Sequence, residues 1–329
     1  MVTIDKIRKP IEAELAEFDL FVRTQFKTED EPLSQMVESI LSSRGKGIRP
    51  MLTMLAAGMV SPSGRGLGRR THLAAMMVEM IHVASLVHDD VIDESDTRRG
   101  RPSVNAVWQS RNAVLAGDWL LARNMEVGLS SGQYDIVNHI VKTIAILCSG
   151  EIMQGDHAKK MDTSREDYMN IIRKKTASLM AASASAGALS AGASSAVTAR
   201  LHRFGEAAGI AFQIGDDILD YTAPSSVTGK PANGDLREGK ITLPLICVLE
   251  RADAEHRREL LAALSECGTD RSKAEFICTA VKEEGGIEAA REVMKAYLQQ
   301  ALSVLADFQP SPYRDALADL CTYIAEREK

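Results

Sequence analysis

The segment THLAAMMVEMIHVASLVHDDVID, residues 71–93, decides the fold class of this chain. Its apolar residues recur at three- and four-residue spacing and end in three carboxylates within five positions, which predicts a long, largely buried helix. Four polar residues fall on one face of that helix: Glu79, His82, Asp89 and Asp93, with Leu86 between them at the same helical steps. Carboxylates roughly 5 Å apart repel by about 3 kcal/mol at an effective dielectric near 20, which favours a cation between them.

The rest of the chain has the same periodicity. Prolines number only 10 among 329 residues, and alternating runs of Val, Ile and Thr are missing. The sequence therefore predicts an all-α protein with breaks where glycine, proline and charged residues gather: 42–50, 61–70, 97–104, 157–164 and 222–240. A new periodic segment follows each break at once, so we expect one domain over residues 1–329.

Residues 177–199 consist mainly of Ala, Ser and Gly. Such a composition also occurs in flexible linkers, but alanine is the strongest helix former. We interpret the segment as a helix whose small side chains let it lie close against its neighbours.

The composition excludes several classes of protein. With 45 acidic and 39 basic residues the net charge is −6, which argues against a general nucleic-acid binder. The five cysteines form no CxxC pair and predict reduced thiols in a cytoplasmic protein. Residues 4–26 lack the order of a signal peptide, and the absence of about 18 consecutive apolar residues predicts no membrane span.

A second acidic motif, GDDILDY at residues 215–221, repeats the arrangement of the first. It contributes Asp216, Asp217 and Asp220, with Gln213 one turn earlier on the same predicted helix. Oxygen ligands without His or Cys pairs favour a hard cation, and magnesium completes its shell with water and substrate phosphates. The two motifs therefore indicate a magnesium-bound diphosphate.

Basic residues accompany both motifs. Arg98 and Arg99 follow the first, and arginine grips phosphate oxygens in a two-pronged fork. The loop GKGIRP supplies Lys46 and Arg49, and two further basic segments bring Lys174 with Lys175 before Thr176, and Lys240 within EGKITLP. Any one of these groups reads equally well as ordinary surface charge, so their value lies in the joint pattern.

With DDVIDESDTRRGRP and GDDILDY in one helical chain, the sequence resembles the trans-isoprenyl diphosphate synthases, also called the polyprenyl synthetase family. The match runs in family order from GKGIRP at Gly45 through KKTASL at Lys174 to DLREGKITLP at Asp235. The first basic loop departs slightly, since many members have GGKRLRP there. The resemblance implies a bundle of roughly a dozen helices around a deep cavity, usually a homodimer.

The resemblance also implies roles for the motif residues. Up to three magnesium ions would be held by Asp89, Asp90, Asp93, Asp216, Asp217 and Asp220. An allylic diphosphate would be held by Arg98, Lys175 and Lys240, with Thr176 and Gln213 close by. Isopentenyl diphosphate, the second substrate, would be held by Lys46, Arg49, His82 and Arg99.

The implied reaction starts when the allylic diphosphate leaves as pyrophosphate, with its charge neutralised by magnesium, lysine and arginine. Isopentenyl diphosphate then attacks the carbocation, and the departing pyrophosphate takes the proton, so no side-chain base is nominated. A loop over residues 222–240 is a candidate lid that keeps water out.

Product length depends on the helix above Asp89, if the family geometry holds. Ala84 and Ser85 lie five and four residues upstream, where short-product members place an aromatic residue. These small side chains predict an open tunnel with Ile81, Met80 and Met77 as the next candidates for a floor. We expect a medium- to long-chain product of about thirty to fifty carbons. Small residues would also arise simply from close helix packing.

Other classes remain open at this point. A short-chain synthase differs only in tunnel depth, and a class I terpene cyclase shares the first motif but normally has a different second one. A non-catalytic partner subunit would have lost aspartates, and a purely structural helical protein leaves both acidic clusters unexplained. His88 beside Asp89 also suggests an HD-type phosphohydrolase, which would leave the second cluster without a task.

The sequence leaves the allylic primer, the downstream pathway and the dimer surface open. It also leaves Tyr323, Arg327 and Lys329 open between a solvated tail and a flap over the isopentenyl diphosphate site.

Overall fold

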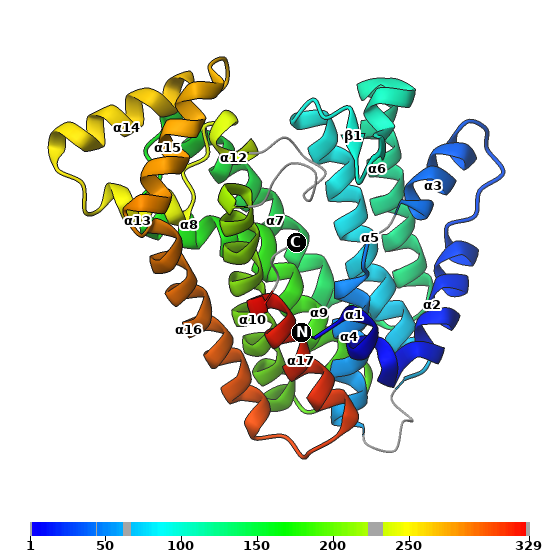
Figure 1. Ribbon diagram of the computed structural model, residues 1–329. Helices are drawn as coiled ribbons and strands as arrows, with labels where there is room; N and C mark the ends of the chain where they lie inside the picture. Colours follow the sequence, from blue (N-terminus) through cyan, green and yellow to red (C-terminus); the bar gives the residue numbers. More distant parts are fainter. Residues whose placement is uncertain (1, 44, 62–66, 223–232, 327–329) are drawn as a thin grey trace.

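The computed structural model describes residues 2–43, 45–61, 67–222 and 233–326. The described chain is 81% helical, which confirms the predicted all-α class. Long helices form the body of the bundle, α13, α14 and α15 form one upper corner, and α2 and α3 lie on the opposite side (Figure 1).

The N-terminal part supplies the following elements in order: α1 (Ile4–Arg8), the 3-10 turn η1 (Lys9–Ile11), α2 (Glu12–Gln25), α3 (Leu33–Ser42), α4 (Ile48–Val60), α5 (Arg69–Ile92), β1 (Thr97–Arg98) and β2 (Arg101–Pro102). The middle supplies α6 (Val104–Ser130), α7 (Tyr134–Lys160), α8 (Arg165–Ile172), the π-helical turn η2 (Arg173–Ala177), α9 (Ser178–Ser190) and α10 (Ser195–Thr222). The C-terminal part supplies α12 (Gly234–Arg237), α13 (Leu243–Leu249), α14 (Ala254–Glu266), α15 (Arg271–Glu283), α16 (Gly286–Ala306) and α17 (Pro312–Glu326).

Each predicted break that the structure describes contains a helix boundary. Other boundaries, such as the one between α6 and α7, were not predicted. Helix α3 ends at Ser42 and α4 begins at Ile48, while α7 ends at Lys160 and α8 begins at Arg165. The predicted lid over residues 222–240 lies partly outside the described residues, since 223–232 are not described.

The break at 97–104 contains a feature that the sequence did not predict. Thr97 pairs with Pro102 and Arg98 with Arg101 in a minimal antiparallel hairpin. Arg99 and Gly100 form its turn with φ of 52° and 75°, the left-handed conformations of a tight hairpin turn. The hairpin holds the basic segment that follows the first acidic motif in a fixed shape.

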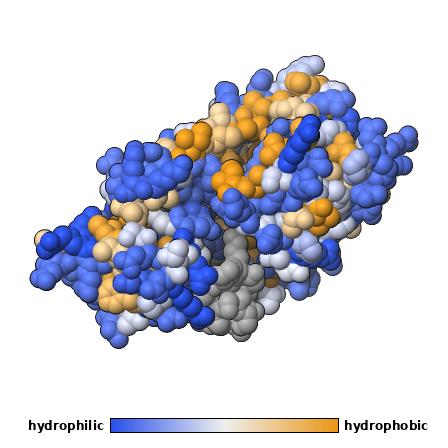
Figure 2. Space-filling model, turned by 90° about the horizontal axis from the view of Figure 1, so that it is seen from above, coloured by the Kyte–Doolittle hydropathy of each residue, from blue (hydrophilic) through white to orange (hydrophobic). Residues whose placement is uncertain are grey.

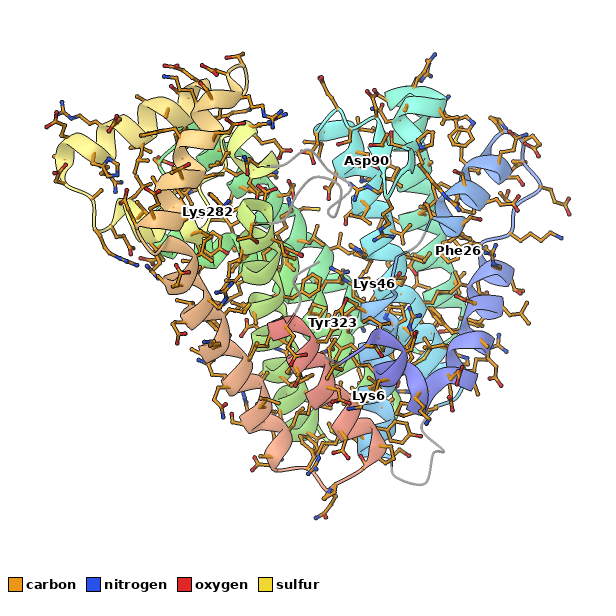
Figure 3. All side chains as sticks on the ribbon, viewed as in Figure 1. Lys6, Phe26, Lys46, Asp90, Lys282 and Tyr323 are labelled. Carbon is orange, nitrogen blue, oxygen red and sulfur yellow. The ribbon has the colours of Figure 1, made fainter. Side chains whose placement is uncertain are left out.

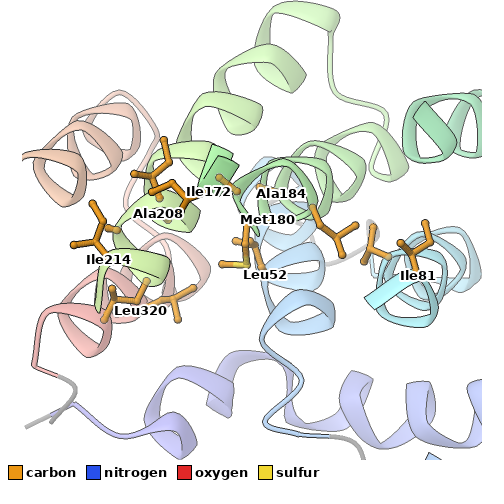
Figure 4. Packing of buried hydrophobic residues seen from close by; sticks show 14 of the residues in the cluster. Leu52, Ile81, Ile172, Met180, Ala184, Ala208, Ile214 and Leu320 are labelled. Carbon is orange, nitrogen blue, oxygen red and sulfur yellow. The ribbon is translucent and has the colours of Figure 1, made fainter. Parts of the chain in front are cut away.

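Close packing of α4, α9 and α10 confirms the interpretation of the small-residue segment. A Cβ on Gly187 would lie 2.1 Å from the Thr53 carbonyl oxygen, and one on Gly205 would lie 2.5 Å from the Met180 carbonyl oxygen. The helix is shorter than expected, because α9 ends at Ser190 and a turn separates it from α10. Leu52, Met180 and Ala184 lie together in this part of the core (Figure 4).

One described helix, α7, is long and apolar enough by composition to cross a membrane. Of its most apolar 18-residue stretch, 28% is buried inside the structure. Its inner face packs in the bundle through Ile136, Val137 and Ile140. Its outer face and that of α6 expose large apolar side chains, here called the α6–α7 apolar face: Val107, Val114, Leu115, Leu129, Tyr134, Ile146 and Ile152. Most of the surface seen from above is hydrophilic, with hydrophobic residues in patches (Figure 2).

Candidate active site

A central cavity of about 850 Å³ collects most of the residues that the sequence singled out. It opens between α5 on one side and α7, η2 and α10 on the other, beneath the hairpin and the segment that follows α12. Its lining includes Lys46, Arg49, His82, Ser85, Asp89, Asp93, Arg98, Arg99, Lys175, Thr176, Gln213, Asp216, Asp217 and Lys240. Three of the predicted residues are absent from that lining: Ala84, Asp90 and Asp220.

Two of the three carboxylates on α5 reach the cavity. Asp89 and Asp93 stand one turn apart on the exposed side of the helix end. Burial raises the pKa of Asp89 to about 6, although Lys175 opposes this effect. A carboxylate with a raised pKa in a cleft is an expected partner for a cation.

Asp90 faces away from the main cavity and acts on a neighbour instead. It is 3% exposed, and its Oδ1 accepts hydrogen bonds from Arg98 at 2.7 Å (Nε) and 2.6 Å (Nη2). This two-pronged ion pair fixes the guanidinium of Arg98 at the rim of the cavity. Asp90 therefore orients an arginine in this structure, and its expected role as a metal ligand stays a prediction.

The second motif is tied into a chain of hydrogen bonds. Asp217 is buried and accepts from Tyr168 Oη at 2.6 Å and from Gln213 Nε2 at 2.8 Å. The side-chain oxygen Oε1 of Gln213 in turn accepts a hydrogen bond from Thr176 Oγ1 at 2.7 Å. Burial, aided by Asp235, raises the pKa of Asp217 well above its ordinary value. Asp216, the preceding residue, lines the cavity beside this chain.

Asp220 supports the segment after the second motif. Its two carboxylate oxygens accept from the backbone N–H groups of Gly234 and Asp235, each at 3.1 Å. The Asp220 side chain therefore holds the start of α12 against the end of α10. Among the described residues, Asp220 is engaged with the backbone rather than with the cavity.

The carboxylates fit a hard cation only together with a substrate. Among the described residues, no group of three or more His, Cys, Asp or Glu side chains is close enough to hold a metal ion. Asp89 and Asp93 approach from α5 and Asp216 from α10, so they line one cavity from opposite helices. Magnesium commonly takes one or two carboxylates and fills its shell with water and phosphate oxygens, and this donor set suits it.

The π-helical turn η2 presents Lys175 and Thr176 to the cavity. Such turns inside helices are frequent at functional sites. Lys175 Nζ lies 2.6 Å from both Glu151 Oε2 and Gln154 Oε1 on α7. Lys240 pairs with Glu238; burial lowers its pKa, but Glu238 and Asp235 outweigh burial, and the net shift is upward. Lys240 is therefore charged at neutral pH.

A second group of basic residues, here called the basic pocket, lines another part of the same cavity beside the first motif, with Glu79 close to Arg49 and Arg99. Burial lowers the pKa of Arg49 to about 10, and burial together with Arg49 and Arg99 lowers the pKa of His82 well below its ordinary value. Arg99 donates to the Ser43 carbonyl at 2.9 Å, and a Cβ on Gly45 would lie 2.5 Å from its guanidinium. The pocket therefore combines charged guanidinium groups with a neutral imidazole, which suits an anion without a metal.

Lys46 completes this pocket with help from both ends of the chain. Its ammonium donates to Tyr323 Oη at 2.8 Å, and its carbonyl accepts from Arg8. Tyr323 lies in helix α17 rather than in a solvated tail, whereas Arg327 and Lys329 lie outside the described residues.

Several cavity residues escaped the sequence analysis: Arg8, Glu151, Gln154, Tyr168 and Phe212 all line the cavity. No motif marks them, because each belongs to a helix whose neighbours are set only by the tertiary fold. Spacing is a signal that could have pointed to three of them: Phe212 adjoins Gln213, and Glu151 and Gln154 lie one turn apart on α7.

The two residues expected to set product length differ in position. Ser85 lines the cavity and donates to the His82 carbonyl at 2.9 Å, whereas Ala84 is fully buried. The deeper candidates Met77, Met80 and Ile81 are also buried in the core and absent from the lining.

Comparison with known proteins agrees with this site. A family model described as Polyprenyl synthetase matches residues 30–281. The heptaprenyl diphosphate synthase component 2 of Geobacillus stearothermophilus is 39% identical over 299 residues, covering 90% of each chain. The octaprenyl diphosphate synthase of Escherichia coli K12 is 31% identical over 329 residues and all of both chains. Names of further relatives cover short-chain as well as long-chain synthases.

The structure is also similar to a polyprenyl synthase from Caulobacter crescentus CB15 complexed with calcium and isoprenyl diphosphate. The TM-score is 0.92 at 29% identity, covering 100% of this chain and 99% of the other.

Proposed function

The chain belongs to the polyprenyl synthetase family, and on that premise we propose that its cavity condenses isopentenyl diphosphate with an allylic diphosphate primer. The enzyme is a trans-prenyltransferase that makes a linear polyprenyl diphosphate of medium to long chain. The observation that carries this proposal is that one cavity is lined both by aspartates of the two motifs and by a second, basic group around Lys46, Arg49 and Arg99, in which Glu79 is a nearby carboxylate.

We assign magnesium to this site: Asp89, Asp93 and Asp216 would hold up to three ions together with the allylic diphosphate. All three line the cavity, and Asp217, which also lines it, is already engaged with Tyr168 and Gln213. When bound, the metal supplies positive charge where the diphosphate leaves. The other three motif aspartates act on neighbours, as their contacts indicate: Asp90 on Arg98, Asp217 on Tyr168 and Gln213, and Asp220 on the start of α12.

Arg98, Lys175 and Lys240 hold the allylic diphosphate and neutralise the charge that grows as its carbon–oxygen bond breaks. Thr176 and Gln213 border the reacting carbons, because they lie in the cavity beside Lys175 and Asp217. Lys46, Arg49, His82 and Arg99 hold isopentenyl diphosphate, which positions its double bond next to the allylic carbon. His82 is neutral, so it contributes a hydrogen bond without adding a further positive charge next to the arginines.

The double-bond electrons of isopentenyl diphosphate form the new carbon–carbon bond, and the resulting cation loses a proton to the departing pyrophosphate. Because the pyrophosphate takes the proton, the reaction needs no side-chain base. Residues that exclude water are required instead, since water would capture the carbocation. The apolar part of the lining serves this purpose through Val83, Leu86, Leu147, Ile171 and Phe212.

Product length follows from the residues on α5 that face the growing chain. Ser85 is small and lines the cavity, so it leaves a path downward where an aromatic ring would end it. A product of about thirty to fifty carbons requires the buried side chains around Ile81 and Met77 to move aside as the chain lengthens.

The assembly is a homodimer that buries the α6–α7 apolar face. Tyr134 and Ile152 are 60% and 73% exposed on one helix, more than a solitary chain normally leaves to water. One relative is named as a component of its synthase, so a different partner chain is the alternative occupant. Light scattering of the purified chain distinguishes the two, because a homodimer has twice the 35.8 kDa of one chain.

The cytoplasm is the proposed location, and the five free cysteines agree with a reducing compartment.

Incorporation of labelled isopentenyl diphosphate tests the proposed function. The purified chain should transfer label into an acid-labile, organic-extractable product when an allylic primer and magnesium are both present, and a chelator should abolish transfer. Label that enters the organic phase without a primer, or with a chelator present, would contradict the proposal.

A further inference from the structure

Residues 45–47 form a loop of the isopentenyl diphosphate site that lies outside the helices, as does Arg99 in the hairpin turn. Gly47 adopts φ of 63° to start α4, so the backbone leaves this loop in a left-handed turn. Lys46 is exposed there, and its long side chain would have many rotamers in isolation. Something else in the structure must therefore fix the ammonium group.

The contact that fixes the ammonium comes from the C-terminal helix. Tyr323 Oη accepts a hydrogen bond from Lys46 Nζ at 2.8 Å, and the ammonium also lies 5.5 Å from the centre of the tyrosine ring. Figure 3 shows Lys46 and Tyr323 meeting between α4 and α17. An ammonium has three donors, so two remain for a phosphate after this contact.

The backbone of the same residue is held from the N-terminal helix. Arg8 Nη2, at the end of α1, donates to the Lys46 carbonyl. Arg8 also lines the cavity, and its Nε is buried without a hydrogen-bond partner. Arg8 is partly buried, and a buried donor without a partner costs free energy, which favours an acceptor beside this Nε.

The two helices that carry these residues are joined to each other. Lys6 on α1 forms an ion pair with Asp319 on α17, with Nζ–Oδ2 of 2.9 Å, and the Val2 N–H donates to Glu326 at 3.3 Å. Asp319 precedes Tyr323 by four residues, so both contacts use one face of α17. Lys6 and Tyr323 lie along this pair of helices in Figure 3.

We propose that Tyr323 and Arg8 are positioning residues that fix Lys46 for isopentenyl diphosphate, so that both ends of the chain build one substrate site. The proposal rests on the proposed function for the identity of the anion. It assigns Tyr323 a role in binding the second substrate and none in the metal-dependent departure of the first diphosphate.

The test is the affinity for isopentenyl diphosphate by isothermal titration calorimetry, without primer or metal. Tyr323→Phe removes only the hydroxyl and should weaken binding about three- to tenfold, as expected for the typical net contribution of one exposed hydrogen bond. Tyr313→Phe removes the same atom from the same helix, where the ring packs on Gly58 and not on Lys46, and should change nothing. In a Lys46→Met background, Tyr323→Phe should have no further effect.

Turnover provides the second readout. Tyr323→Phe should raise KM for isopentenyl diphosphate by the same factor and leave KM for the allylic primer and the melting temperature unchanged. Equal affinity of Tyr323→Phe and wild type, or an equal loss for both substrates, would overturn the proposal. A wild type that binds isopentenyl diphosphate but elongates nothing would count against the proposed function alone, since the binding comparison does not depend on turnover.

Discussion

Replacing Ser85 by phenylalanine should shorten the product. Ser85 lies four residues before Asp89, about 6 Å along the helix axis, and its side chain faces the cavity. The main chain of an isoprene unit has four bonds of about 1.5 Å, which reach about 5 Å when extended. A ring at this depth leaves room for an allylic primer of one or two units beyond the diphosphate. One further condensation adds five carbons, so we expect products of about ten to fifteen carbons instead of thirty to fifty.

Ala84→Phe provides the paired variant. Ala84 is fully buried on the same helix, so a phenyl ring there must displace core side chains, at a cost of about 1–3 kcal/mol of unfolding free energy. It too should shorten the product, by pushing core residues into the path of the chain. Ser85→Phe should shorten the product at little cost in stability, because its ring enters open space.

The assay is elongation with labelled isopentenyl diphosphate, dephosphorylation of the products, and reversed-phase chromatography against prenyl alcohol standards. Thermal melts of both variants show whether each is folded. Products of unchanged length from both folded variants would refute the tunnel argument. Shortening by Ala84→Phe alone would mean that the chain grows along a different face of α5 from the one that Ser85 occupies.

Three further changes follow from the contacts in the site. Asp89→Asn should lower kcat by at least about 100-fold with an unchanged melting temperature, as measured by steady-state kinetics, because it removes a charged metal ligand without disturbing packing. Tyr168→Phe leaves buried Asp217 with one hydrogen bond fewer and should lower the unfolding free energy by about 1–3 kcal/mol in urea titrations; no loss would contradict the 2.6 Å contact. Since burial raises the pKa of Asp89 to about 6, its charged form is lost as pH falls through that value, and magnesium affinity at pH 5.5 should be weaker than at pH 7.5. Equal affinity at both values would show that Asp89 is not a ligand.

The fold class and the centre of the site were predictable because they depend on local spacing. Asp89 and Asp93 are one turn apart, so helical periodicity alone places them on one face. Asp90 points elsewhere for the same reason, since adjacent residues on a helix diverge by about 100°. The motif gave all three aspartates one role, whereas the ion pair with Arg98 separates Asp90 from its neighbours.

The rest depends on contacts between distant parts of the chain. Tyr168 precedes Asp217 by 49 positions and Tyr323 follows Lys46 by 277, and no pattern in the sequence encodes either pairing. The hairpin at Thr97–Pro102 is too short for strand periodicity to be visible. Likewise, the π-helical turn at Arg173–Ala177 differs from an α-helix by one residue per turn, which hydrophobic spacing does not resolve.

The two-site account makes a direct prediction about stoichiometry. Incubation of the purified chain with farnesyl diphosphate, isopentenyl diphosphate and magnesium should release one pyrophosphate for each isopentenyl unit added. All carbon should then be recovered in linear prenyl diphosphates longer than the primer. Cyclised hydrocarbons, prenyl alcohols or monophosphates, or pyrophosphate released without chain growth, would contradict the claim that the cavity holds two diphosphates and joins their chains.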